Sequence, residues 1–196
     1  MFGSPVFGFR ENNLDFLPSM PALEQVWFWE ISLKDVEGLY ALKNLRRFGI
    51  HEKRVAIDFS QFPELEEVVW HPRGKDCGLE QLLKLRNLDL WRFKPKEKSY
   101  KALRLPQGVE KLEVNWSNPA DLDGFPYLPR LRELQFHYCR NLASIDRIAE
   151  FAPNLRKLVV TRCANLVEFE SVHDLGLEHL YVNIRGKEVA IKRVRE

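Results

Sequence analysis

The sequence predicts an α/β solenoid in which short parallel strands stack in chain order, joined by helical, 3₁₀ and irregular return segments. Two observations lead to this prediction. An apolar pattern recurs along nearly the whole chain, and the last two apolar residues of each copy of the pattern lie two positions apart. Residues two apart in a strand point to the same face, so each repeat would bury that face against its neighbours. The chain has 196 residues and is 45% hydrophobic, which is enough for a buried core.

The recurring pattern is L-x-x-L-x-L, with an apolar residue at each L. Its eight copies are Leu23-Val26-Phe28, Leu45-Phe48-Ile50, Leu65-Val68-Trp70, Leu85-Leu88-Leu90, Val109-Leu112-Val114, Leu131-Leu134-Phe136, Leu155-Leu158-Val160 and Leu177-Leu180-Val182. Successive first positions are 22, 20, 20, 24, 22, 24 and 22 residues apart. A fixed period in this range is typical of repeat architectures. We expect a degenerate ninth copy of the pattern, between Phe7 and Leu14, to form the first turn of the stack.

The repeat resembles that of the leucine-rich-repeat family, and the resemblance covers nearly the whole chain. It implies an open, curved solenoid with a parallel sheet on its concave face and short helices, 3₁₀ turns and irregular returns on its convex face. It also implies a non-enzymatic module that binds a protein partner through the concave face. Without an attached enzyme or anchor, the chain is similar to free-standing bacterial leucine-rich-repeat proteins, which include adaptors, secreted effectors and immunity proteins that neutralise a toxin.

The repeat boundaries give the predicted domain organisation. We expect one domain over 1–196, with a partial repeat or cap at 1–20, about eight repeats at 21–184, and a final capping strand or tail at 185–196. The returns differ in spacing. Helical spacing occurs at 36–42, 79–85 and 145–151, whereas 57–62 and 122–126 favour irregular or 3₁₀ structure.

Charge and cysteine content limit the class of protein. The 30 basic and 28 acidic residues give a net charge of +2, which by itself indicates no nucleic-acid or membrane partner. The first residues lack the pattern of a secretory signal, and no apolar run approaches the roughly 20 residues of a membrane span. Three cysteines in a chain of this size favour a reducing compartment. We therefore expect a cytoplasmic monomer that does not contact membranes.

No motif for catalysis or cofactor binding is present, so we predict neither an enzyme nor a cofactor. The chain lacks a phosphate-binding loop, a nucleophile elbow and a paired-cysteine metal motif. Cys139 and Cys163 occupy equivalent positions, and we interpret them as buried structural thiols rather than a redox pair. His51 and His71 could share a metal ion, but no third ligand is evident. Nucleic-acid binding and an unfamiliar enzyme remain as alternatives.

A column of charges follows the first apolar residue of each repeat. Its members are Glu24, Arg46, Glu66, Arg86, Glu110, Arg132, Arg156 and Glu178. Neighbouring strands would place these residues about 4.8 Å apart, and the sign alternates along most of the column. We expect the alternation to fix the register of the strands, because like charges directly opposite each other are unfavourable.

Aromatic residues predict where a partner binds. Trp29, His51, His71, Trp91 and His137 occupy the outward position after the last core residue of their repeats; Trp27, Trp116 and Tyr138 flank that column. Tryptophan is enriched at interface hot spots, and an exposed apolar strip is unusual on a protein without a ligand. We therefore predict a protein-binding surface formed by these eight residues. The alternative is that the rings pack on one another or lie beneath the N-terminal segment.

Overall fold

The computed structural model describes residues 1–193, with side chains described through Val189. The chain forms two compact units, Met1–Leu88 and Asp89–Glu196. The single domain expected over 1–196 stays a prediction. Within the described residues no helix is long and apolar enough to cross a membrane.

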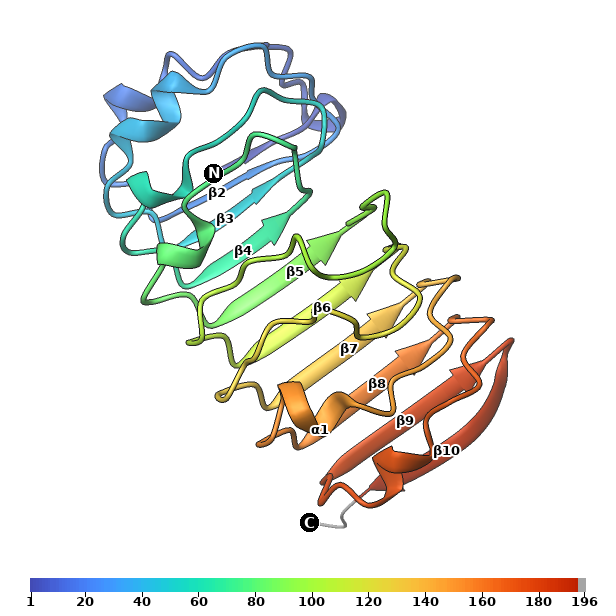
Figure 1. Ribbon diagram of the computed structural model, residues 1–196. Helices are drawn as coiled ribbons and strands as arrows, with labels where there is room; N and C mark the ends of the chain where they lie inside the picture. The colour runs from blue at the N-terminus through green and yellow to red at the C-terminus, as the bar shows by residue number, and fades with distance from the viewer. Residues whose placement is uncertain (194–196) are drawn as a thin grey trace. The chain divides into compact units, whose positions relative to one another are not determined.

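The first unit is built on parallel strands that pair in chain order (Figure 1). They are β1 (Phe2–Gly3), β2 (Gln25–Phe28), β3 (Arg47–Ile50) and β4 (Glu67–Trp70). The register places Val26 beside Phe48 and Phe48 beside Val68, so equivalent repeat positions stack. The returns carry the 3₁₀ turns η1 (Pro5–Phe7), η2 (Leu17–Ser19), η3 (Glu37–Ala41), η4 (Phe59–Gln61) and η5 (Leu79–Gln81).

The second unit continues the same construction. Strand β5 (Asn87–Trp91) begins just before the unit boundary and is followed by β6 (Lys111–Asn115), β7 (Glu133–His137), β8 (Lys157–Thr161), β9 (His179–Ile184) and β10 (Lys187–Arg193). Strands β6 to β9 pair in parallel, and β10 returns antiparallel to β9. The returns contain one α-helical turn, α1 (Ile148–Phe151), and the 3₁₀ turn η6 (Glu170–His173).

The core confirms the predicted repeat. Every apolar position of the eight pattern copies is buried except Leu23, which is half-buried. Cys139 and Cys163 are buried as expected, and their thiols donate to the carbonyl oxygens of Val114 and Phe136 in the preceding repeats. Stacked parallel strands with short returns make each unit a leucine-rich-repeat-type solenoid.

The structure of the chain ends and of the returns agrees only in part with what the sequence predicts. The opening strand is Phe2–Gly3 rather than a copy between Phe7 and Leu14, because Phe7 ends a 3₁₀ turn and is 75% exposed. The capping strand expected at 185–196 forms as β10, and residues 194–196 lie outside the described part. Helical spacing at 36–42 and 79–85 gives 3₁₀ turns.

The column of alternating charges forms ion pairs between neighbouring repeats. An oxygen of Glu66 lies 2.6 Å from Nη2 of Arg46, and Glu178 lies 3.1 Å from Nη1 of Arg156. All four side chains are exposed, so each pair contributes little to stability. The pairs join corresponding positions of adjacent repeats, and their role in fixing the register stays a prediction.

Candidate binding surface

The predicted binding residues lie in both units. Trp27, Trp29, His51 and His71 belong to the first unit; Trp91, Trp116, His137 and Tyr138 belong to the second. Each unit therefore carries its own candidate surface.

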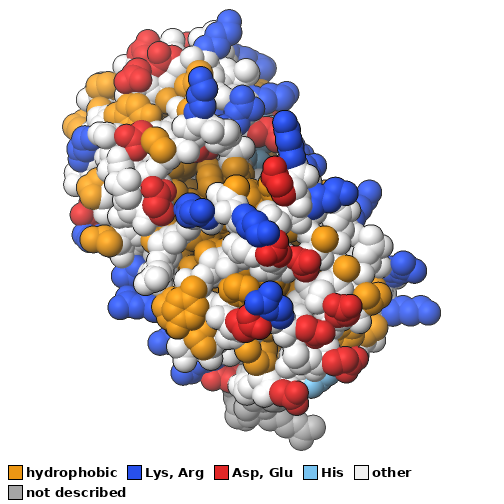
Figure 2. Space-filling model, in the orientation of Figure 1, with side chains coloured by type: hydrophobic (Ala, Val, Ile, Leu, Met, Phe, Trp, Pro, Cys, Tyr) orange, Lys and Arg blue, Asp and Glu red, His pale blue; other side chains and the backbone are white. Residues whose placement is uncertain are grey.

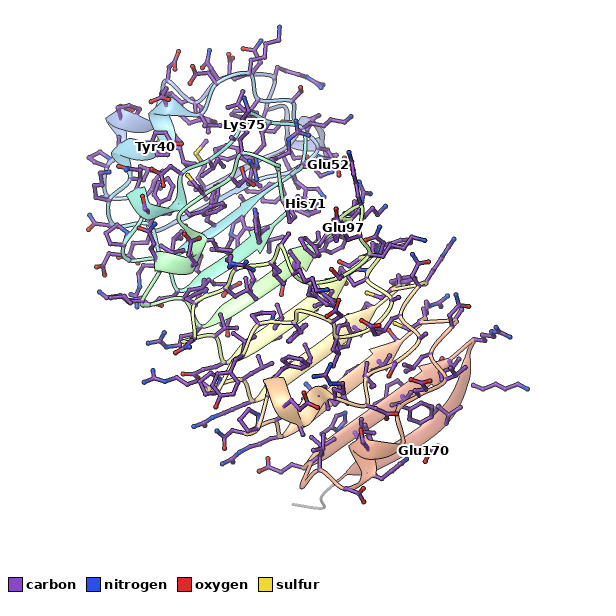
Figure 3. All side chains as sticks on the ribbon, viewed as in Figure 1. Tyr40, Glu52, His71, Lys75, Glu97 and Glu170 are labelled. Atoms are coloured by element: carbon purple, nitrogen blue, oxygen red, sulfur yellow. The ribbon has the colours of Figure 1, made fainter. Side chains whose placement is uncertain are left out.

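In the first unit the rings after β2, β3 and β4 contact one another. The ring centroids of Trp29 and His51 are 5.5 Å apart, those of Trp29 and His71 are 5.4 Å apart, and the two imidazoles are 5.2 Å apart. His71, labelled in Figure 3, is only 2% exposed. The expectation of an exposed ring at His71 is wrong, because the rings of Trp29 and His51 pack on it.

Trp27 also packs within its own unit. Its strand partner is Gly49, and a Cβ atom added to Gly49 would lie 2.0 Å from the Trp27 ring. The indole therefore covers the glycine backbone and is half-buried. This contact explains why a glycine stands in the middle of β3, where it otherwise weakens a strand.

A buried ion pair supports the segment that follows His71. The guanidinium of Arg54 donates to both carboxylate oxygens of Asp76, each at 2.7 Å, and to the carbonyl oxygen of His71 at 3.1 Å. Asp76 also accepts from Nε1 of Trp70 at 2.9 Å. Burial alone would raise the pKa of Asp76, but the hydrogen bonds and charge of Arg54 and the Trp70 hydrogen bond hold it below its usual value.

In the second unit the candidate residues follow the ends of β6 and β7, where the backbone turns. Trp116 and Tyr138 have φ angles of 55° and 57°, in the left-handed region. Among the described residues other than glycine, this conformation follows a strand at Glu30, Arg92, Trp116, Tyr138, Arg162 and Arg185. The N–H of Trp116 donates to the carbonyl of His137 at 2.9 Å, and that of Tyr138 donates to Thr161 at 3.0 Å. The next repeat therefore fixes each turn.

The turns place side chains from successive repeats side by side. The rings of Trp116 and Tyr138 are parallel within 4°, with centroids 4.4 Å apart. The guanidinium carbon of Arg162, from the following repeat, lies 5.5 Å from the centre of the Tyr138 ring. Trp116 stays 39% exposed despite the stack. Trp116, Tyr138 and Arg162 are called the aromatic–arginine ladder below.

Two hollows border this ladder. The larger, of about 700 Å³, is lined by Trp116, Tyr138, Arg140, Thr161, Arg162, Ala164, Tyr181, Asn183, Arg185 and Gly186. The smaller, of about 430 Å³, is lined by Lys94, Trp116, Ser117, Asn118, Tyr138, Arg140 and Asn141. The two stacked rings and Arg140 belong to both hollows, so the hollows form one continuous surface.

His137 and Trp91 are the remaining candidate residues of the second unit. Nδ1 of His137 lies 2.6 Å from the hydroxyl of Thr161, and Nε2 lies 3.0 Å from Oε1 of Gln135. Burial lowers the pKa of His137; the charge of Glu113 opposes this shift and that of Lys111 adds to it, so the structure favours the neutral imidazole. Trp91 is the last residue of β5 and is half-buried.

Sequence reasoning missed the arginines of the hollows as a group. Arg140 and Arg162 flank Cys139 and Cys163 in two equivalent segments, Tyr138-Cys139-Arg140-Asn141-Leu142 and Arg162-Cys163-Ala164-Asn165-Leu166. Aligning Tyr138 with Arg162 in these segments, and adding Trp116 one repeat earlier, would have revealed the ladder.

Stacked parallel strands joined by short returns define a leucine-rich-repeat-like scaffold. Among solved structures, the chain is similar to the leucine-rich repeat domain of the type III effector XopL, with a TM-score of 0.54 and 18% identity over 83% of this chain and 69% of that one. At this identity the likeness shows the fold alone. The sequence matches no family model and no curated protein.

Proposed function

We propose that the protein is a non-enzymatic module that binds a protein partner, with Trp116 and Tyr138 at the centre of the contact. The observation that carries the proposal is the pair of stacked, partly exposed rings beside a continuous hollow. Large aromatic side chains dominate interface hot spots, and their stacking limits the entropy lost on binding.

The backbone does not require aromatic residues at these positions. Arg92, Arg162 and Arg185 make the same left-handed turn with charged side chains. A left-handed conformation costs a residue with a Cβ roughly 1 kcal/mol or more, and such positions gather at binding sites. The presence of rings at Trp116 and Tyr138, where the turn itself does not need them, therefore supports a role in binding.

The lining of the larger hollow favours binding over catalysis. It contains no histidine, cysteine or carboxylate, the side chains that most often act as general bases or thiol nucleophiles. Within the described residues there is also no group of three or more side chains suited to hold a metal ion. A leucine-rich-repeat-type fold is typical of non-enzymatic interaction modules.

We also propose the first-unit residues as a separate binding surface. Trp27, Trp29 and His51 are half-buried, so part of each ring is accessible to a partner, while the buried His71 packs against Trp29 and His51. Trp91 and His137 would contribute in the same way in the second unit. Four further points stay predictions: a bacterial origin, a cytoplasmic location, a monomeric state, and a role as adaptor, effector or immunity protein.

Site-specific photo-crosslinking tests the proposal. A benzophenone amino acid replaces Tyr138 in one variant and Tyr127 in the other, and both are irradiated in the source cells. Tyr127 is a matched control because it is 54% exposed in the same unit but outside both hollows. We expect a defined protein adduct from position 138 that is missing from position 127. No adduct at 138, equal adducts at both positions, or an adduct removed by nuclease would reject the proposal.

A further inference from the structure

Positive charge gathers around the aromatic–arginine ladder. Arg140, Arg162 and Arg185 line the larger hollow, and Lys94 joins Arg140 in the smaller one, whereas neither lining contains an aspartate or glutamate. The chain as a whole carries a net charge of only +2, so this excess of positive charge is local. A hollow lined by one sign of charge concentrates ligands of the opposite sign.

These cations differ from other arginines of the protein in their pairing. Arg46, Arg147 and Arg156 each form an ion pair with a glutamate. Among the described side chains, by contrast, no carboxylate forms an ion pair with the cations of the hollows. Nε of Arg185 donates to the carbonyl of Ala164 at 3.1 Å, which leaves its terminal nitrogens available. Glu188 accepts from the Tyr181 hydroxyl at 3.2 Å and lies outside the lining.

The geometry of the cations suits carboxylates. Arg162 lies over Tyr138, and this contact holds its planar guanidinium in place. A fixed guanidinium binds a carboxylate through two parallel hydrogen bonds, which are stronger than neutral ones. Asn118 and Asn141 in the smaller hollow add amide groups of the kind that bind a peptide backbone.

A peptide fits this surface better than a nucleic acid. The Trp116 and Tyr138 rings stack on each other, and Arg162 covers Tyr138 from the next repeat, so a base could stack only on the outer face of Trp116. A nucleic acid also needs a basic stripe to follow its backbone. On the face of the molecule drawn in Figure 2, acidic and basic side chains are interspersed, so that face carries no basic stripe.

We infer that the partner presents an acidic peptide segment to this surface, with its glutamate or aspartate carboxylates bound by Arg140, Arg162 and Arg185 and its apolar part against Trp116. The inference rests on the proposed function and adds the chemistry of the partner. The negative charge comes from the carboxylates of a protein.

Fluorescence anisotropy with defined probes tests this inference on the full chain. The probes are a labelled glutamate-rich peptide containing leucine, its copies with each glutamate replaced by glutamine or by lysine, and a single-stranded RNA of the same length. We expect the glutamate peptide to bind most tightly. Arg162→Glu should weaken it at least about tenfold. Arg10→Glu is the matched control because Arg10 is exposed in the first unit and undergoes the same change in charge.

A charge swap separates recognition from a structural effect. The variant Arg140→Glu with Arg162→Glu should lose the glutamate peptide and gain the lysine peptide, which a merely misfolded surface would not do. Equal binding of the glutamate and glutamine peptides, equal loss in the Arg10 control, tighter binding of RNA, or no binding of any probe would each overturn the inference. If a protein still crosslinks at position 138 in that case, the proposed function stands and only the acidic partner is rejected.

Discussion

Trp116 and Tyr138 adopt a backbone conformation that side chains of their size rarely adopt, and this has a measurable consequence. Glycine tolerates a positive φ whereas alanine does not. We therefore expect Trp116→Gly to be more stable than Trp116→Ala by about 1 kcal/mol, measured by urea unfolding. Trp27, in the extended strand β2, is the control, and there alanine should be the more stable replacement. The same order at both positions would contradict the left-handed turn.

Asp76 forms an ion pair with Arg54 in the interior of the first unit and so neutralises its charge. Both side chains are almost fully buried. Asp76→Asn keeps the shape but leaves the guanidinium without a counter-charge, so we expect a loss of about 3–5 kcal/mol in the free energy of unfolding. Glu64→Gln is the control, because the Glu64–Lys84 pair is exposed and should contribute less than about 1 kcal/mol. A loss as small as in the control would show that the pair is not buried in solution.

The lowered pKa of Asp76 gives its stabilisation a pH dependence of defined sign. The contribution is fully present above the unfolded-state pKa of about 3.9 and is lost as the pH falls through the lower folded-state pKa. Chemical denaturation across acidic pH should therefore show a steeper fall in stability below about pH 4 for the wild type than for Asp76→Asn. Parallel curves for the two proteins would contradict this assignment.

At the scale of elements, we expect the ion pairs between repeats to set the register of the strands more than they stabilise the fold. Arg46→Glu places a glutamate opposite Glu66, and adding Glu66→Arg restores an opposite-charge pair. We expect a double-mutant cycle to show a small, favourable coupling between the two residues that decreases at high salt. Additive effects of the two changes would mean that the pair does not act as a unit.

The strands could be predicted from the sequence because each depends on a local apolar pattern. The returns could not be predicted as well. Helical spacing at 36–42 is compatible with α and 3₁₀ turns alike, and the structure has the 3₁₀ turn Glu37–Ala41. A 3₁₀ turn rises about 2.0 Å per residue against 1.5 Å for an α-helix, so it spans a short return with fewer residues.

At the scale of the molecule, the sequence identified aromatic residues but not their environments. His71 follows a core residue of its strand, which predicts an exposed side chain. In the structure the rings of Trp29 and His51, from earlier repeats, bury it, and its carbonyl oxygen accepts a hydrogen bond from Arg54. Those contacts join residues far apart in the chain, which a period of about 22 residues does not reveal. The sequence placed Trp116 and Tyr138 beside the main column, and the left-handed turn that stacks them depends on bonds to the next repeat.

The most direct test of the account is the affinity of the crosslinked partner, once purified, for glycine variants at the ladder. Trp116→Gly and Tyr138→Gly keep a residue that suits the left-handed turn, so a loss of binding reports on the rings themselves. Isothermal titration should show that each variant weakens binding by about 2 kcal/mol or more, while Tyr127→Gly binds as the wild type does. Unchanged affinity in both folded ladder variants, together with a loss in Trp29→Ala, would contradict the account and place the binding surface in the first unit.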